Sequence, residues 1–268
     1  MMKEGKYSQG LSKLKEVIAN NPDTDVADDA NMLVADHYFR LKDYQAAATR
    51  YMMVVDAKVF SPLEGKAVMG AIDCYTGTLA LDLVDPDSPD RVREQVAGGC
   101  DILVNAAGIS AFGLFDDTDS TLWQDTMAIN VEAVARLTRA LLPLLRASSQ
   151  ARVINIGSTC SQFATAGLSA YVVSKHAILG LTRALASELG PDGITVNCIQ
   201  PGAIVTAITA PTFAENPEFR AHWENKAALG RLGQPEDVAP LAAFLASEEA
   251  RFISGHGIYA DGGAMQQN

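Results

Sequence analysis

Four short apolar runs after residue 100 have the composition of buried β-strands. Each is rich in β-branched residues and ends in small or turn-forming residues. The runs cover residues 101–108, 152–158, 194–202 and 257–263. Helical patterns between and around them cover about 121–147, 171–189 and 235–247. Strands that alternate with helices in this way predict an α/β fold with a doubly wound, parallel sheet.

A further strand is predicted just before these runs, at about 79–84, and a helix follows it at about 89–97. Such a helix is long enough for a right-handed crossover between two adjacent parallel strands. We therefore expect the strand at 79–84 to pair directly with the strand at 101–105. A gap between them would leave unpaired strand edges exposed.

The first 77 residues are different and show an internal period of 37 residues. The residues that recur are Tyr7 as Tyr44, Asp36 as Asp73, and Tyr38 as Tyr75. Such a period is typical of stacked helix pairs, and residues 29–51 resemble a tetratricopeptide repeat. We expect residues 1–77 to form a helical-repeat segment that could bind a peptide partner. Residues 78–268 are expected to form the α/β domain.

The charge of the chain narrows the classes of partner. Its 268 residues include 32 acidic residues and 21 Lys or Arg residues, which gives a net charge of −11. This balance argues against nucleic acid and anionic membranes as partners. No apolar run is long enough to span a bilayer, and the N-terminus lacks a signal peptide's hydrophobic region, so we expect a cytoplasmic location. The cysteines and histidines are scattered, and we expect no metal site.

Tyr171 and Lys175 form the most informative polar pair of the chain. Residues four apart on a helix lie on the same face, so the ammonium of Lys175 can sit beside the phenol of Tyr171. A neighbouring positive charge lowers a tyrosine pKa from its usual value of about 10, which would make Tyr171 an acid or base near neutral pH. Just upstream, Gly157 and Ser158 end a predicted strand and place a hydroxyl at the sheet edge where ligands bind. This combination indicates a hydride-transferring oxidoreductase.

Residues 79–264 resemble the classical short-chain dehydrogenase/reductase family, close to its 3-oxoacyl-carrier-protein reductase branch. The resemblance implies that Ser158 binds the substrate carbonyl and that Tyr171 is the acid or base. It also implies that Lys175 lowers the pKa of Tyr171 and binds the nicotinamide ribose, and that Asn130 helps to hold a proton-relay water near that lysine. The implied reaction interconverts an alcohol and a carbonyl of a small molecule with NAD or NADP.

The resemblance also implies a set of cofactor-binding residues. Besides Tyr171 and Lys175 they are Asp82, Asn105, Ala106, Gly108, Pro201, Gly202 and Thr206. In the family the first of these lies near the adenine, and the segment matching 201–206 holds the nicotinamide carboxamide. Ala106 departs from the family, which has a second asparagine at this position.

The family's first strand and its glycine-rich turn, Thr-Gly-x-x-x-Gly-x-Gly, have no counterpart in this chain. The segment from Gly65 to Gly70 has the wrong spacing. Glycines at that turn let backbone amides approach a pyrophosphate. We therefore expect an incomplete Rossmann-like sheet and weak binding of NAD or NADP. Two functions stay open: an NAD(P)-dependent oxidoreductase, or a non-catalytic chimera that joins a helical-repeat binding module to a remnant reductase domain.

The helices at 121–147 and 171–189 are expected to pair across a two-fold axis, as in the family's oligomers. Small residues such as Ala170, Ser174 and Gly180 would allow close approach on the second helix. The sequence therefore predicts a homodimer or homotetramer.

Overall fold

The chain divides into two compact units, Met1–Ala80 and Leu81–Asn268. The structure is a computed structural model that describes residues 12–20, 25–40, 50, 82–96, 98–110, 112–117, 120–206 and 208–266. In the first unit, residues 12–20 are helical and α2 spans Asp25–Arg40. The Nζ of Lys15 donates a 3.0 Å hydrogen bond to the hydroxyl of Tyr38. Most of the recurring positions (Tyr7, Tyr44, Asp73 and Tyr75) lie outside the described residues, so the helical repeat stays a prediction.

The second unit contains a parallel sheet, as the sequence predicts. Its described strands lie in the order β1-β2-β3-β4. They are β1 (Ile102–Asn105), β2 (Arg152–Ile156), β3 (Thr195–Pro201) and β4 (Gly257–Ala260). All neighbouring pairs are parallel, and Asn105 pairs with Asn155 while Cys198 pairs with Gly257. The carboxyl ends of the strands therefore meet at one edge of the sheet.

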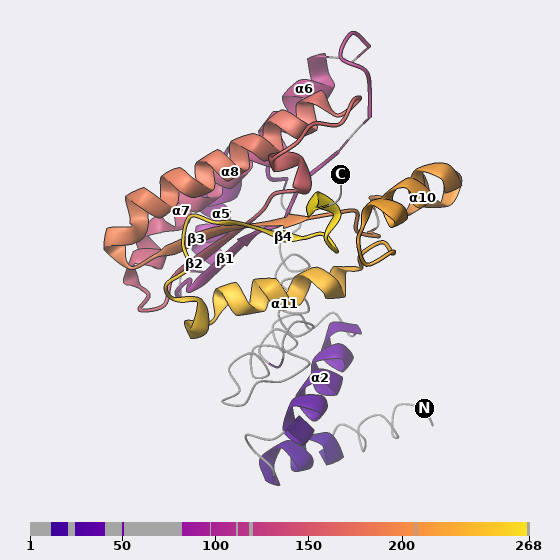
Figure 1. Cartoon of the computed structure of the whole chain (residues 1–268). Helices are drawn as coiled ribbons and strands as arrows, with labels where there is room; N and C mark the ends of the chain where they lie inside the picture. The colour runs from indigo at the N-terminus through magenta and orange to yellow at the C-terminus, as the bar shows by residue number, and fades with distance from the viewer. Residues whose placement is uncertain are drawn as a thin grey trace. The chain divides into compact units, whose positions relative to one another are not determined.

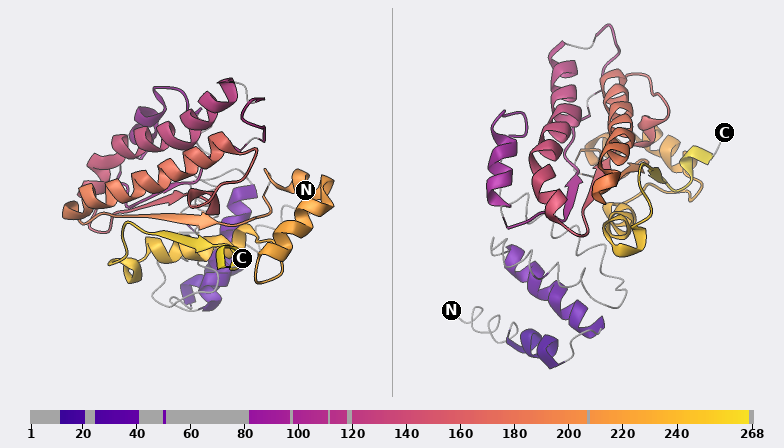
Figure 2. Two further views of the ribbon diagram at one scale, coloured as in Figure 1. Left: turned by 45° about the horizontal axis from the view of Figure 1, so that its top comes forward. Right: turned by 90° about the vertical axis from the view of Figure 1, so that its left-hand side faces the viewer.

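Helices cover both faces of this sheet. Their bounds are Ser88–Gln95 (α5), Ser120–Met127 (α6), Ala133–Ala147 (α7), Ser169–Leu189 (α8), Ala210–Glu215 (α9), Pro217–Lys226 (α10) and Pro235–Ala246 (α11). A π-helical segment, η1 (Ala128–Glu132), joins α6 to α7. Short 3₁₀-helices are η2 (Thr159–Ser161), η3 (Gly190–Asp192), η4 (Glu248–Ala250) and η5 (Ala264–Gln266). Figure 1 shows α7 and α8 over one face of the sheet and α11 over the other, and in Figure 2 α7 and α8 again run side by side.

Alternate residues of the central strands fill the two cores. On one face Val153 and Val196 pack with Leu145 of α7 and Leu189 of α8. On the other face the buried residues are Ile154, Ile199, Ala242, Leu245 and Ala250. Strands that are buried on both faces need near-continuous apolar sequence, which explains the runs seen in the sequence.

The predicted strand at 79–84 is wrong for its described part. Residues 82–84 form a turn, and residues 79–81 lie outside the described residues. The carboxylate of Asp82 accepts a 3.0 Å hydrogen bond from the backbone N–H of Val84, and Asp85 N–H donates to Asp82 O at 3.1 Å. Asp side chains favour such turns because they bond to the backbone two residues further on. The predicted helix that follows is present as α5.

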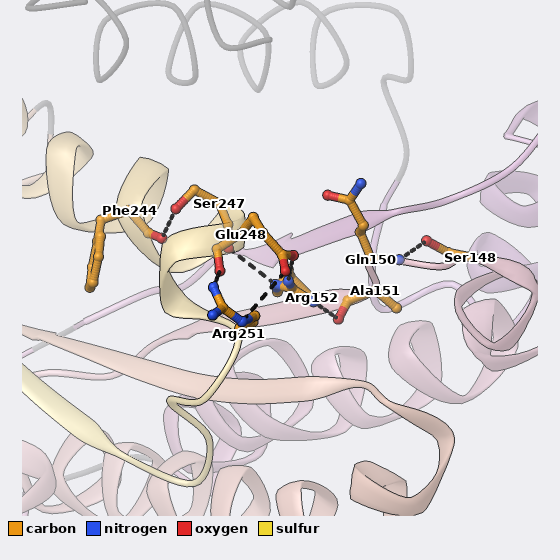
Figure 3. Close-up of polar contacts among 8 residues, drawn as sticks. All are labelled: Ser148, Gln150, Ala151, Arg152, Phe244, Ser247, Glu248 and Arg251. Carbon is orange, nitrogen blue, oxygen red and sulfur yellow. Dashed lines mark hydrogen bonds and ion pairs between the residues drawn. The ribbon is translucent and has the colours of Figure 1, made fainter. Parts of the chain in front are cut away.

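A buried arginine lies at the amino end of β2 (Figure 3). Arg152 is only 3% exposed, and its guanidinium donates to Ala151 O at 3.1 Å and to Ser247 O at 3.5 Å. It also forms a 3.3 Å ion pair with Glu248, which contacts Arg251 at 3.7 Å. The backbone oxygen that Arg152 meets at Ser247 follows the last turn of α11. This cluster therefore links the sheet to α11 at the end opposite the predicted site.

Candidate active site

The predicted catalytic residues meet at the carboxyl edge of the sheet. Ser158 follows β2, while Tyr171 and Lys175 lie in the first two turns of α8. The ammonium Nζ of Lys175 lies 5.5 Å from the centroid of the Tyr171 ring. It donates a 2.8 Å hydrogen bond to the backbone oxygen of Ile156, the last residue of β2. The helical spacing in the sequence thus places a phenol and an ammonium together above the strand that carries the hydroxyl.

Burial controls the proton affinity of both groups. Lys175 is 6% exposed, and loss of hydration lowers its pKa from 10.5 to about 8. Burial raises the pKa of Tyr171 above its ordinary value, and a side-chain hydrogen bond with Ser158 acts in the opposite direction. The net shift of the Tyr171 pKa is therefore upward, opposite to the expected direction, because desolvation of the phenolate is the largest effect. Tyr171 holds its proton at neutral pH, which suits a proton donor.

Ser158 is fixed at the start of η2. Its Oγ accepts a 3.1 Å hydrogen bond from the backbone N–H of Cys160, and its own N–H donates to Ser161 Oγ at 3.2 Å. The hydroxyl proton remains able to donate. A Cβ on Gly157 would lie 2.6 Å from the sulfur of Cys198 and 2.9 Å from Ser161 Oγ. Only glycine fits at this position, which brings β2 and β3 close together just before the serine.

Asn130 lies in the π-helical segment η1, where one extra residue widens the helix. It is 1% exposed, and its Oδ1 accepts a 2.8 Å hydrogen bond from Ile109 N–H. Its Nδ2 donates to Ile109 O at 2.9 Å and to the hydroxyl of Ser174 at 3.0 Å. The amide therefore ties the loop after β1 to α8, next to Lys175.

The predicted residues nearest to Lys175 fit the nicotinamide end of a dinucleotide. A Cβ on Gly108 would lie 3.3 Å from Asn130 Oδ1 and 3.6 Å from Lys175 Nζ, so glycine keeps this space open. Ala106 is exposed at the same loop. Lys175 uses one of its three N–H donors on Ile156, which leaves donors for a ribose hydroxyl. A flat ligand could approach the backbone here.

The segment after β3 carries the remaining predicted carboxamide site. Gly202 N–H donates to Ala260 O at 3.1 Å, which fixes the loop after Pro201. The backbone N–H of Thr206 donates to Thr209 Oγ1 at 2.9 Å, and the two hydroxyls lie 3.2 Å apart. Thr206 is thus held at the start of the segment that leads into α9.

One predicted cofactor residue, Asn105, turns its side chain into the protein, and another, Asp82, lies in the turn before α5. The side chain of Asn105 is buried and donates to Asn155 Oδ1 at 2.8 Å and to Thr138 Oγ1 at 3.3 Å. It joins β1 to β2 and α7. Asp82 is exposed in the turn before α5, and the guanidinium of Arg136 holds this turn by a 2.6 Å hydrogen bond to Leu83 O.

Two short helices, α9 and α10, follow Thr206 and form a segment, here named the lid, that contacts the loop between Ser158 and Tyr171. Phe213 stacks on Phe219 with centroids 5.8 Å apart, and Phe219 meets Trp223 edge-on at 6.3 Å. Lys226 lies 5.2 Å from the ring centroid of Phe163, a residue of the loop between Ser158 and Tyr171. The sequence carries no local signal for the contact between Phe163 and Lys226.

A separate cavity of about 500 Å³ lies beside the carboxyl ends of β3 and β4. Its wall includes Ala203, Trp223, Tyr259 and Asp261, but none of the predicted catalytic residues. No group of three or more metal-ligating side chains occurs in the part of the chain that the structure describes. None of the described helices combines the length and hydropathy that a bilayer crossing requires.

Known proteins resemble the chain over most of its length. The protein-family model described as Enoyl-(Acyl carrier protein) reductase matches residues 64–265. The 3-oxoacyl-(acyl-carrier-protein) reductase FabG of Vibrio cholerae is 36% identical over 188 residues, which cover 69% of this chain and 76% of that protein. Human Dehydrogenase/reductase SDR family member 4 is 35% identical over 201 residues, covering 75% of this chain and 70% of that protein.

The solved structures extend this similarity to the fold. The gluconate 5-dehydrogenase of Burkholderia cenocepacia, in complex with NADP and tartrate, superposes with a TM-score of 0.67 and 26% identity. The superposition covers 76% of this chain and 83% of that protein. The match to the sheet and its helices confirms the predicted Rossmann-like α/β class.

Proposed function

Because the chain belongs to the short-chain dehydrogenase/reductase family of oxidoreductases, we propose that it interconverts an alcohol and a carbonyl compound with NAD or NADP. The observation that carries the proposal is the arrangement of Ser158, Tyr171 and Lys175 at the carboxyl edge of the sheet. There Ser158 and Tyr171 lie beside a buried lysine that has no carboxylate partner among the described residues. Buried ionisable groups with shifted pKa values are typical of catalytic sites.

In the direction of reduction, Ser158 and Tyr171 both donate hydrogen bonds to the substrate carbonyl oxygen. Lys175 and Thr206 would hold a reduced nicotinamide, which would supply the hydride for the new C–H bond and would itself be oxidised. The C=O π bond breaks as Tyr171 transfers its phenolic proton to the oxygen, so that carbonyl, hydride and proton give the alcohol. The raised pKa of Tyr171 keeps that proton in place until the oxygen becomes basic.

Lys175 stabilises the phenolate that remains after the transfer. Its ammonium is 5.5 Å from the ring centroid, within the range of favourable interaction. Since its pKa is about 8, this charge is present below that pH and is lost above it. Asn130 positions the lysine indirectly, through the hydroxyl of Ser174 on the same helix.

The proposal includes weak binding of the dinucleotide. Gly108, Lys175 and Thr206 fit its nicotinamide end, but the sequence has no glycine-rich turn for the pyrophosphate. Losing two or three charge-assisted hydrogen bonds, at roughly 1.5–3 kcal/mol each, would raise a micromolar dissociation constant towards the millimolar range. We also propose a homodimer or homotetramer that pairs α7 and α8 across a two-fold axis.

Calorimetric titration with NADH and NADPH, followed by an assay of carbonyl reduction, tests the proposal. We expect dissociation constants near the millimolar range and turnover only at high dinucleotide concentration. A low micromolar constant would contradict weak binding and would mean that another segment of the chain supplies a phosphate site. Absence of both binding and turnover would favour the alternative, a remnant reductase domain joined to a helical-repeat binding module.

A further inference from the structure

Four buried polar side chains form a hydrogen-bonded network close to the carboxyl edge of the sheet. Asn105, at the end of β1, donates from Nδ2 to Asn155 Oδ1 at 2.8 Å and to Thr138 Oγ1 of α7 at 3.3 Å. Asn155 of β2 donates in turn from its Nδ2 to the Oγ1 of Thr182 on α8 at 2.9 Å. The hydroxyl of Thr182 donates to the backbone oxygen of Ile178 at 2.8 Å. The network therefore joins two strands to the two helices that cover this face of the sheet.

The network lies inside an apolar core. Its four side chains are between 0% and 7% exposed. Val153 and Val196, which point to the same face of the sheet as Asn155, pack with leucines of α7 and α8. Polar groups at such a position cost free energy unless each one is hydrogen-bonded, so apolar side chains would stabilise this layer at least as simply. A satisfied network instead fixes distances and directions that apolar packing leaves adjustable.

Two members of the network are tied to the groups that carry the chemistry. Asn155 precedes Ile156, whose backbone oxygen accepts the 2.8 Å hydrogen bond from Lys175 Nζ. Thr182 follows Lys175 by about two helical turns on α8, so both side chains project from the same face of the helix. The end of β2 is thus joined to α8 at two points, through Lys175 and through Thr182. Two fixed points set the tilt of the helix over the strand, and Tyr171 lies one turn before the first of them.

We infer that Asn155 and Thr182 are positioning residues for carbonyl reduction, an inference that rests on the proposed oxidoreductase function. They hold α8 against β2, and the helix in turn fixes Tyr171 and Lys175 relative to Ser158. Neither belongs to the groups that would contact the substrate carbonyl, so each acts through the placement of α8. A displacement of about 1 Å between reacting groups is enough to lower a rate constant about a hundredfold.

The test uses Thr182→Val, which removes the hydroxyl and keeps the shape of the side chain. It leaves the Nδ2 of Asn155 without its acceptor, and we expect α8 to loosen over β2 and water to reach the ammonium of Lys175. The pKa of Lys175, followed by NMR in a chain with ¹³Cε-labelled lysine, should rise from about 8 by roughly half a unit or more. Its resonance is assigned by its absence in Lys175→Met. The nearby Cys198 thiol stays neutral over this range, because burial raises its pKa to about 11. In the assay of carbonyl reduction, kcat should fall about tenfold to a hundredfold while KM stays within about twofold.

Two variants serve as controls. Thr182→Ser keeps the hydroxyl and should keep both the pKa of Lys175 and kcat close to the wild-type values. Asn197→Leu is the control for a general loss of stability. Asn197 is 1% exposed on β3, and its Nδ2 donates to Ile253 O at 2.7 Å on the face of the sheet that α11 covers. This variant should destabilise the fold without shifting the pKa of Lys175.

An unchanged pKa of Lys175 in Thr182→Val, or an equal shift in Asn197→Leu, would overturn the inference, because the network would then contribute to stability alone. If the wild-type chain reduces no carbonyl compound, the proposed function fails. A pKa shift in Thr182→Val that Thr182→Ser does not show would then still support the placement of Lys175 by the network. Turnover by the wild-type chain that Thr182→Val leaves unchanged would overturn the inference and leave the proposed function standing.

Discussion

Two buried cations lie at opposite ends of β2, and their surroundings differ. Arg152, 3% exposed at the amino end, donates to two backbone oxygens and pairs with Glu248. Lys175, 6% exposed at the carboxyl end, donates to Ile156 O and has no carboxylate partner in the described part of the chain. The arginine's charge is compensated, whereas the lysine's charge is not.

The difference distinguishes two ends of the sheet. We call the amino end, with Arg152, the structural end, and the carboxyl end, with Ser158, Tyr171 and Lys175, the chemical end. A compensated charge holds elements together, as Arg152 does for β2 and α11. An uncompensated charge in a desolvated position is costly to the folded state, and the pKa of Lys175 accordingly falls to about 8. The largest effect of substitutions at the carboxyl end should therefore be on activity, and that of substitutions at the amino end should be on stability.

The largest expected effect is on activity at the carboxyl end. Tyr171→Phe removes only the hydroxyl that donates the proton, and we expect it to lower kcat/KM for carbonyl reduction by about a thousandfold or more. The free energy of unfolding, measured in urea, should change by less than about 1 kcal/mol because the ring remains. Retained activity in this variant would mean that another group supplies the proton.

At the amino end the effect should fall on stability. Arg152→Met leaves the oxygens of Ala151 and Ser247 without their donor, and we expect a loss of about 2–4 kcal/mol in the free energy of unfolding. Glu248→Gln is the matched control. The Glu248 side chain is 60% exposed, so its removal should cost less than about 1 kcal/mol. Equal losses in the two variants would show that the ion pair, not the backbone contacts, holds this end.

Gly157→Ala tests how closely β2 and β3 approach at the chemical end. The new Cβ would meet the Cys198 sulfur at 2.6 Å, and we expect a loss of about 1–3 kcal/mol in urea unfolding. Adding Cys198→Ala to the same chain should restore part of this loss, because the sulfur is the nearest clashing atom. Purely additive losses in the double variant would contradict a contact between the two positions.

The smallest expected effect is a gain in stability at the chemical end. Lys175→Met removes a buried charge and one hydrogen bond, and we expect a net gain of about 1–2 kcal/mol at pH 7. The folded pKa of Lys175, about 8, lies below its ordinary value of 10.5, so the unfolded chain binds more protons between these values. The contribution of Lys175 to the free energy of unfolding of the wild-type chain should therefore become less unfavourable from pH 8 to 10.5. The stability gain of Lys175→Met over the wild-type chain should shrink over the same range. Urea unfolding across that range measures it, and a gain that does not depend on pH would contradict burial of the ammonium as its cause.

The sequence predicts the strands of the sheet and the meeting of Ser158, Tyr171 and Lys175, because each depends on short-range spacing and on the common direction of parallel strands. Prediction from the sequence fails for properties that depend on burial or on contacts between residues far apart in the chain. The pKa of Tyr171 depends on how much water surrounds the folded site, which the spacing from Lys175 does not encode. The inward side chain of Asn105 depends on Asn155, fifty residues away.

Contacts across the lid show the same limit of local patterns. Phe163 and Lys226 belong to segments that meet only after the sheet has formed, so neither residue carries a signal of its own. The turn at 82–84 is a different case, because its residues carry two signals. Their apolar pattern favours a strand, whereas Asp82 and Asp85 favour a turn through their side-chain hydrogen bonds to the backbone, and the prediction followed the strand pattern.

The π-helical segment η1 has a consequence for insertions and deletions in this helix. It contains one residue more than a regular α-helix would need, and each α-helical residue turns the chain by about 100°. Deleting one residue within 128–132 would therefore remove the bulge and leave a regular helix, in which α6 and α7 keep their relative orientation. Inserting one more residue there would instead rotate α6 by about 100° against α7, and Trp123 would turn away from Phe115, which it now meets edge-on at 6.5 Å, although neither residue had been altered.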